Sequence, residues 1–127
     1  MKQQIFEITE NIKIAKDVML MTLSGDTTDL SKPGQFVNIK LEGQFLRRPI
    51  SVCDYTKDTL TLIYKIVGVG TEKMAKYPVG TKLDILTGLG NGFDTSKSGA
   101  SPLLIGGGVG VPPMYNLCKT LIAEGKQ

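Results

Sequence analysis

Hydrophobic and polar residues alternate along most of the first 88 positions of the chain. Residues 3–24 alternate in two patches that are separated by a polar turn at Lys16 and Asp17. Further strand-like runs, several rich in β-branched residues, occupy 35–41, 49–54, 59–67 and 81–86, and residues 71–77 have the character of one or two helical turns. A period of two with turn residues between short runs predicts six or seven strands, in an antiparallel barrel or a sandwich.

The period changes near the C-terminal end. Leu103–Ile105 is a short apolar run that predicts a strand, and the glycine-rich segment "GGGVGVPP" follows it. Apolar residues then recur at helical spacing, at Val111, Met114, Leu117, Cys118, Leu121 and Ile122. Pro112 and Pro113 suit a first helical turn, and Gly125 suits the C-terminal cap. Because strand, glycine turn and helix normally open a βαβ unit, we expect residues 1–99 to form the β domain and residues 100–127 to begin an incomplete α/β domain.

Composition and charge exclude several classes of partner. The 127 residues, 41% hydrophobic and 21% charged, are typical of one globular domain. A net charge of +3, spread over scattered lysines, argues against a nucleic acid partner. No apolar run approaches the roughly 18 residues of a membrane span. The charged N-terminus differs from a signal peptide, so we expect no membrane partner and a cytoplasmic protein.

Histidine is absent from the chain, and the only two cysteines, Cys53 and Cys118, are far apart. These facts exclude an ordinary zinc site within the chain and the nucleophile pairs that need histidine. Carboxylates, lysines or a bound cofactor remain to carry any chemistry, and a cofactor is favoured. We predict no metal site and no catalytic residues, and we expect each cysteine to be a small buried hydrophobe.

Three segments have the chemistry to bind a cofactor. "FLRRPISV" contains the only two arginines, Arg47 and Arg48, and a guanidinium matches phosphate oxygens two at a time; a surface arginine pair is the alternative. "IYKIVGVGT" ends a strand in a Gly-x-Gly-Thr turn whose N–H groups favour an anion, although a simple hairpin turn would look the same. "GGGVGVPP" would let a dinucleotide approach the backbone, but such a turn alone is weak evidence.

The order of these segments resembles the FAD-binding flavoproteins of the ferredoxin reductase type. Within that superfamily, "LRRPIS", "IYKIVGVGT", "GLGNGF" and "LLIGGGVGVPPMY" resemble the electron transfer subunits of NAD-dependent dihydroorotate dehydrogenases, over residues 33–124. The resemblance implies a mainly β fold: a six-stranded antiparallel Greek-key FAD-binding barrel, followed by the first strand and helix of an incomplete α/β nucleotide-binding domain. It also implies an oxidoreductase subunit of pyrimidine biosynthesis.

The resemblance further implies which residues bind FAD. Arg48 would bind the pyrophosphate, Pro49 and Ile50 would lie beside the isoalloxazine, and Ser51 would form a hydrogen bond near the ring. The role of Arg47 is less defined. Ile50 stands where many relatives have an aromatic residue that stacks on the flavin, so apolar burial rather than stacking is expected there.

A second strand and two glycine-rich turns complete the implied set. Ile63, Tyr64 and Lys65 would form the second flavin-contacting strand, with Tyr64 as a possible stacking ring. Gly70 and Thr71 would present N–H and hydroxyl donors to the phosphates, and the glycine would supply room or a positive φ. The segment that would face the nicotinamide cofactor comprises Gly106, Gly107, Gly108 and Gly110.

In the complete system implied by the resemblance, electrons pass from an FMN-containing dihydroorotate dehydrogenase catalytic subunit through a 2Fe-2S cluster to FAD and on to NAD. We expect this chain to keep only FAD, as an electron transfer module that is not self-sufficient, with NAD and the cluster confined to full-length relatives. The alternatives are the FAD domain of another ferredoxin or NAD(P)H reductase and a flavin-free barrel that acts as an interaction domain. The C-terminal helix could dock on the barrel, pair with a second copy or fray, and a homodimer is favoured.

Overall fold

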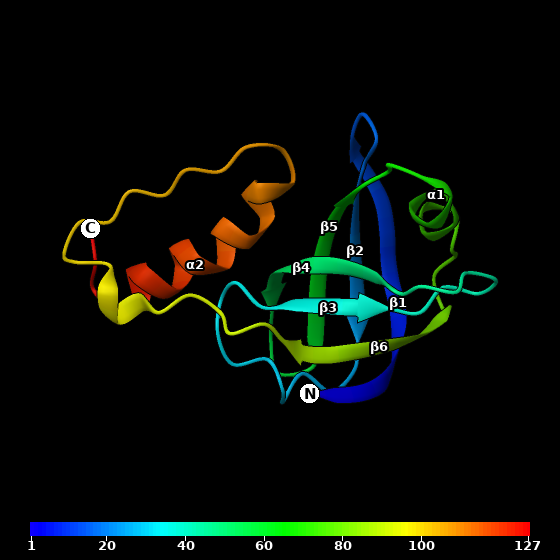
Figure 1. Cartoon of the computed structure of the whole chain (residues 1–127), viewed down its shortest axis with the longest axis horizontal. Coiled ribbons are helices and arrows are strands. Elements are labelled where there is room, and N and C mark those ends of the chain that lie inside the picture. The colour runs from blue at the N-terminus through cyan, green and yellow to red at the C-terminus, as the bar shows by residue number, and fades with distance from the viewer.

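Six segments with alternating buried and exposed side chains form the strands of a barrel in the computed structural model, which describes all 127 residues (Figure 1). The strands are β1 (Lys2–Ala15), β2 (Val18–Ser24), β3 (Phe36–Ile39), β4 (Arg48–Tyr55), β5 (Thr59–Lys65) and β6 (Lys82–Leu89). The alternation is regular in β2, where Met19, Met21 and Leu23 are buried. The predicted strands and the turn at Lys16 and Asp17 are therefore confirmed.

The order of the strands around the barrel is β1-β2-β5-β4-β3-β6, and β6 closes the ring by pairing with β1. Every pair is antiparallel. β3, β4 and β5 are consecutive neighbours, and β6 returns to lie beside β3, which is the Greek-key order. Each strand has two neighbours, so the structure is a barrel rather than a sandwich and the predicted Greek-key barrel is confirmed.

The interior of the barrel is filled by a single hydrophobic cluster to which all six strands contribute. A short helix, α1 (Val69–Ala75), adds to it through Met74, which is fully buried. Burial of a large apolar side chain contributes about 1.5–3 kcal/mol relative to exposure, so Met74 is a strong anchor for the helix. The predicted helical turns at residues 71–77 are confirmed, and they pack directly on the core.

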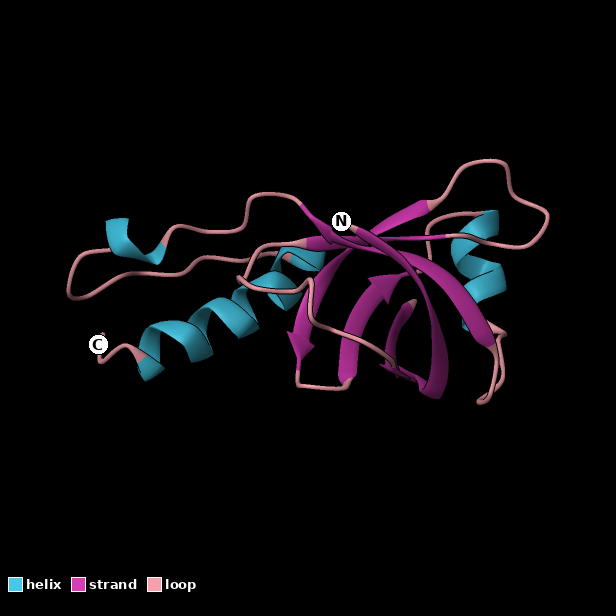
Figure 2. Ribbon diagram, turned by 90° about the horizontal axis from the view of Figure 1, so that it is seen from below, coloured by secondary structure: helices cyan, strands magenta, loops and turns pink.

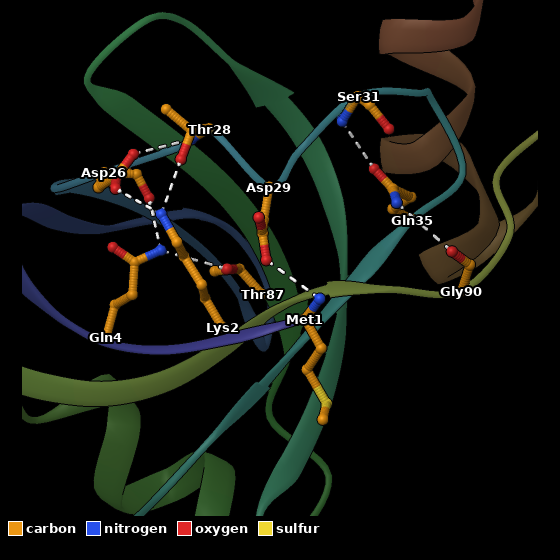
Figure 3. A network of polar contacts seen from close by, with 10 residues as sticks. All are labelled: Met1, Lys2, Gln4, Asp26, Thr28, Asp29, Ser31, Gln35, Thr87 and Gly90. Carbon is orange, nitrogen blue, oxygen red and sulfur yellow. Dashed lines mark hydrogen bonds and ion pairs between the residues drawn. The ribbon is translucent and has the colours of Figure 1, made fainter.

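A polar network holds the N-terminal residues against the connection between β2 and β3 (Figure 3). The ammonium group of Lys2 lies 3.1 Å from a carboxylate oxygen of Asp26 and 3.1 Å from the hydroxyl of Thr28. The Thr28 backbone N–H donates to the other oxygen of Asp26 at 2.9 Å. The terminal amine of Met1 lies 3.1 Å from a carboxylate oxygen of Asp29. Hydrogen bonds from Thr28 and from Lys2 lower the pKa of Asp26 to about 2.

The C-terminal helix, α2 (Val111–Ala123), packs on the outside of β4. Lys119 of α2 forms a 2.9 Å ion pair with Asp54 of β4, and Leu121 is buried. Figures 1 and 2 show α2 beside the barrel, on the side away from α1. The predicted helix is confirmed: prolines occupy its first turn, and Gly125 follows its end with a positive φ of 82°.

Two sequence predictions for the C-terminal part of the chain are wrong. Leu103–Ile105 forms no strand, and Leu103 and Ile105 are 84% and 82% exposed. A strand needs a neighbour with free backbone groups, and the closed barrel offers none. Cys118 is exposed on α2, whereas Cys53 is buried as expected. None of the helices is long and apolar enough to cross a membrane.

Candidate functional site

A pocket of about 350 Å³ lies where the start of β4 meets the end of β5. These strands pair antiparallel, so the first residues of one lie beside the last residues of the other. The lining residues are Arg48, Pro49, Ile50, Ser51, Ile63, Tyr64, Lys65, Val67, Thr71 and Val109. The two sequence segments predicted to contact a cofactor therefore meet in one pocket, whose size falls within the range of small-molecule sites.

The two adjacent arginines have different environments. Arg47 donates to the carbonyl oxygens of Asn38 and Asp84 at 3.3 and 3.2 Å, and it forms a 3.1 Å ion pair with the Asp84 carboxylate. Burial alone would raise the pKa of Asp84, but hydrogen bonds from Gln3 and Arg47 outweigh this effect and hold it below its usual value. The Arg47 side chain is therefore engaged in contacts that join β3 and β6.

Arg48 lines the pocket and has no acidic partner. Its guanidinium donates only within its own loop, to the Leu46 carbonyl at 2.8 Å and to the Gln44 side-chain oxygen at 3.1 Å. A guanidinium has five donor hydrogens, so several remain for a ligand. Of the two arginines, Arg48 is the one with a charge available to a bound anion.

Gly70 of α1 stands directly against Arg48. A Cβ at this position would lie 2.5 Å from Nε and 2.9 Å from Nη2 of that arginine, closer than any real side-chain atom could remain. The φ of Gly70 is not in the left-handed region, so of the two expected reasons for a glycine here, room and a positive φ, only room applies. What this position requires is the absence of a side chain, because any Cβ would displace the guanidinium from its place at the pocket.

Thr71 is buried, and its hydroxyl forms hydrogen bonds with the backbone just before α1. Its Oγ1 accepts from the N–H groups of Val67 and Gly68 at 2.8 and 3.2 Å, and the hydroxyl donates to the Gly68 carbonyl at 3.1 Å. The predicted donation from this hydroxyl to a phosphate is therefore not available in the structure. The role of the side chain is to hold the first turn of the helix.

Tyr64 borders the pocket, but its side chain belongs to the core and is only 2% exposed. Its hydroxyl donates to the side-chain oxygen of Asn11 at 3.0 Å, and burial raises its pKa to about 12. A ring that is almost fully buried leaves little of its face free, so the structure gives no support to the possible stacking of Tyr64 on a ligand. The neighbouring Ile63 and Lys65 point the other way, with Lys65 exposed.

The glycine-rich segment before α2 reaches the same pocket through one residue. The turn η2 (Gly108–Gly110) contains Val109, which lines the pocket although its glycine neighbours do not. A Cβ on Gly107, Gly108 or Gly110 would meet no atom within 4 Å, so their lack of a side chain serves no contact within the chain. Sequence reasoning missed Val109 and Val67 as lining residues, and apolar residues inside glycine turns were the only available signal.

The charge of the pocket follows from its lining. Arg48 and Lys65 are cationic, and no aspartate or glutamate is among the lining residues. The remaining wall is largely apolar, from Ile50, Ile63, Val67 and Val109 among others. A pocket with an apolar floor and uncompensated positive charge fits a ligand that combines a flat apolar part with phosphates or another anion.

Comparison with known proteins identifies relatives of the whole chain. It is 42% identical, over an alignment of 133 residues, to the "Dihydroorotate dehydrogenase B (NAD(+)), electron transfer subunit" of Bacillus mycoides (strain KBAB4), a match that covers 98% of this chain and 51% of the relative. The chain is homologous to these electron transfer subunits. It spans about half the length of the curated relatives it matches. No model of a known protein family matches the chain.

Solved structures with a similar fold also match nearly the whole chain. A structure described as an NADH-dependent reduced ferredoxin-NADP oxidoreductase matches with a TM-score of 0.87 and 30% identity, over 96% of this chain and 45% of the other. Phthalate dioxygenase reductase matches with a TM-score of 0.80 and 23% identity, over 98% of this chain and 41% of the other, and shows the fold alone. The barrel therefore has the ferredoxin reductase-type fold that the sequence resemblance implied.

Proposed function

We propose that this chain binds FAD in the pocket between β4 and β5 and forms the FAD-containing part of an electron transfer protein. The observation that carries the proposal is Arg48, an unpaired guanidinium at the edge of an apolar pocket that contains no carboxylate. The homology of the chain to the dihydroorotate dehydrogenase electron transfer subunits supports the same function.

The residues present fit the two chemical parts of this cofactor. Ile50, Ile63 and Val67 offer apolar cover for a flat ring system, and Ser51 is exposed, with a hydroxyl that can donate or accept beside a polar ring edge. Arg48 can donate to two phosphate oxygens at once, and Gly70 leaves the space in which it does so. When bound, FAD supplies the electron-transfer chemistry, while the chain binds it, orients it and excludes water from one face.

The proposal extends to partners through the relatives. We propose that the chain acts with an FMN-containing catalytic subunit, and that a 2Fe-2S cluster and NAD complete the electron path, as the sequence resemblance implies. We also propose a boundary near residue 99, since β6 ends at Leu89 and α2 begins at Val111. Gly106, Gly107, Gly108 and Gly110 would then face a nicotinamide cofactor beside the flavin, since Val109 between them reaches the flavin pocket.

Reconstitution with flavin tests the proposal directly. The purified chain is incubated with excess FAD, passed through a desalting column and scanned for visible absorbance, with riboflavin and FAD titrations followed by quenching of flavin fluorescence. We expect a yellow protein that binds FAD more tightly than riboflavin, because riboflavin lacks the phosphates proposed to contact Arg48. A colourless protein that takes up neither flavin would refute the proposal and favour the flavin-free alternative.

A further inference from the structure

The side chain of Asn11 joins three parts of the molecule. It lies on β1, and its Nδ2 donates to the backbone carbonyl oxygens of Met74 and Tyr77 at 2.8 and 3.1 Å. Its Oδ1 accepts from the hydroxyl of Tyr64 at 3.0 Å. Met74 is in α1 and Tyr77 follows its end, so one amide ties the C-terminal end of α1 to two barrel strands.

The three contacts use both the donor hydrogens and the acceptor oxygen of the amide. Both hydrogens of Nδ2 are donated to carbonyl oxygens at the C-terminal end of α1, where that of Met74 also accepts from the Tyr77 N–H at 3.1 Å, and Oδ1 accepts from the hydroxyl of a core residue. A carboxylate here could still accept from Tyr64, but it would place an oxygen against the two carbonyl oxygens. The position therefore calls for an amide rather than for any polar side chain.

The orientation of α1 matters at its other end. Gly70 lies four residues before Met74, and residues four apart share one face of a helix. Gly70, Thr71 and Met74 are the buried residues of α1, and Gly70 abuts the Arg48 guanidinium. Because α1 is only seven residues long, a movement at its C-terminal end is carried to Gly70 within about one turn.

We infer that Asn11 is a positioning residue for the cofactor pocket: by holding the C-terminal carbonyls of α1, it sets the space between Gly70 and Arg48. The inference rests on the proposed FAD-binding function and adds to it a residue outside the pocket. Tyr64, whose side chain is buried in the core, is the one lining residue to which the Asn11 side chain forms a hydrogen bond. Its effect therefore acts through α1 on the phosphate contact, not on the ring-binding walls.

The test compares FAD and riboflavin affinity in the full chain. Asn11→Asp keeps the acceptor for Tyr64 and removes both donations to α1, so we expect FAD affinity to fall by about tenfold through misplacement of Arg48. Riboflavin, which lacks the phosphates, should change by less than about twofold. The ratio of FAD affinity to riboflavin affinity is decisive. If Asn11 only stabilised the fold, its replacement would lower thermal stability and leave this ratio unchanged.

Thr27→Val is the matched control. The Thr27 hydroxyl also joins two backbone carbonyls: its single hydrogen lies between those of Thr56 and Lys57, at 2.6 and 2.8 Å, and these residues form the β4–β5 hairpin, away from the pocket. This variant should lose stability and keep both affinities within about twofold.

The outcomes separate the inference from the function on which it rests. If unmodified chain binds neither flavin, the proposed function fails and the inference fails with it. If unmodified chain binds FAD and Asn11→Asp leaves the affinity ratio unchanged, the inference alone is overturned. Should Asn11→Asp fail to fold, Asn11→Ala removes both donations to the end of α1 without adding a charge. It should likewise lower the ratio by about tenfold, and an unchanged ratio there would also overturn the inference.

Discussion

Replacement of each of the two adjacent arginines by alanine should separate ligand binding from stability. Arg48→Ala removes an unpaired guanidinium from the pocket, and Arg47→Ala removes the group that joins β3 and β6. The two variants change neighbouring positions by the same number of atoms and the same charge. Any difference between them must come from where the side chains lie.

Arg48→Ala should mainly lower FAD affinity, whereas Arg47→Ala should mainly lower the free energy of unfolding. Arg48→Ala loses two hydrogen bonds inside its own loop, which should change stability by less than about 0.5 kcal/mol. Loss of a charge-assisted bidentate contact to phosphate should weaken FAD binding by about 2 kcal/mol, or roughly 30-fold in Kd. Arg47→Ala loses two carbonyl contacts and a mostly buried ion pair with Asp84. It should lower stability by about 2 kcal/mol and Tm by roughly 6–10 °C, with little effect on Kd.

Two assays on the same preparations decide the matter. Fluorescence quenching gives the Kd for FAD, and thermal unfolding followed by circular dichroism without flavin gives Tm. Equal losses of FAD affinity in the two variants, or unchanged affinity in Arg48→Ala, would contradict the assignment of Arg48 to the phosphates. A Tm of Arg47→Ala equal to that of the unmodified chain would contradict the structural role of Arg47.

Three further predictions concern other parts of the molecule. Gly70→Val should abolish FAD binding while the barrel stays folded by circular dichroism, since its Cβ would take the space of the Arg48 guanidinium; a folded variant that stays yellow would contradict this. Because the pKa of Asp26 is lowered in the folded state, its carboxylate should contribute stability that is present above about pH 4 and is lost as the pH falls towards 2. Asp26→Asn should therefore lose less stability than the unmodified chain across this pH range in acid unfolding. If the stability of both proteins falls equally with pH there, the prediction is refuted. NADH should not bleach the flavin of the reconstituted chain at modest concentrations, because residues 106–110 form a largely exposed turn that belongs to no parallel sheet whose later strands could contact a ribose. Fast bleaching on rapid mixing would show a working nicotinamide site.

The fold could be predicted from the sequence wherever one face of an element is buried. β2 and β5 alternate because a barrel has one inner and one outer face, and α2 shows the spacing of a helix packed on one side. The alternation along β5 also predicts the position of Tyr64. It lies two residues beyond the buried Leu62, so its side chain points to the same inner face. Leu103–Ile105 is apolar enough for a strand, but a strand depends on a neighbour that lies elsewhere in the chain.

The site was predictable as a set of segments, but not as a set of contacts. Arg47 and Arg48 are indistinguishable in the sequence, and the difference between them is set by Asp84, which is 37 positions away from Arg47. Thr71 has the residue type of a phosphate ligand and of a helix cap alike, and only the geometry decides between them. Asn11 gave no signal, because one amide in an exposed strand has no pattern until its partners are known.

The closed ring of strands determines where the molecule can adhere to others. Each of the six strands pairs on both sides, so the barrel presents no edge onto which another chain could add a strand. The unpaired residues Leu103–Ile105 are different: they are apolar, largely exposed and have no β partner. Association through β pairing would therefore have to begin outside the barrel, at a segment such as Leu103–Ile105, and not at one of its strands.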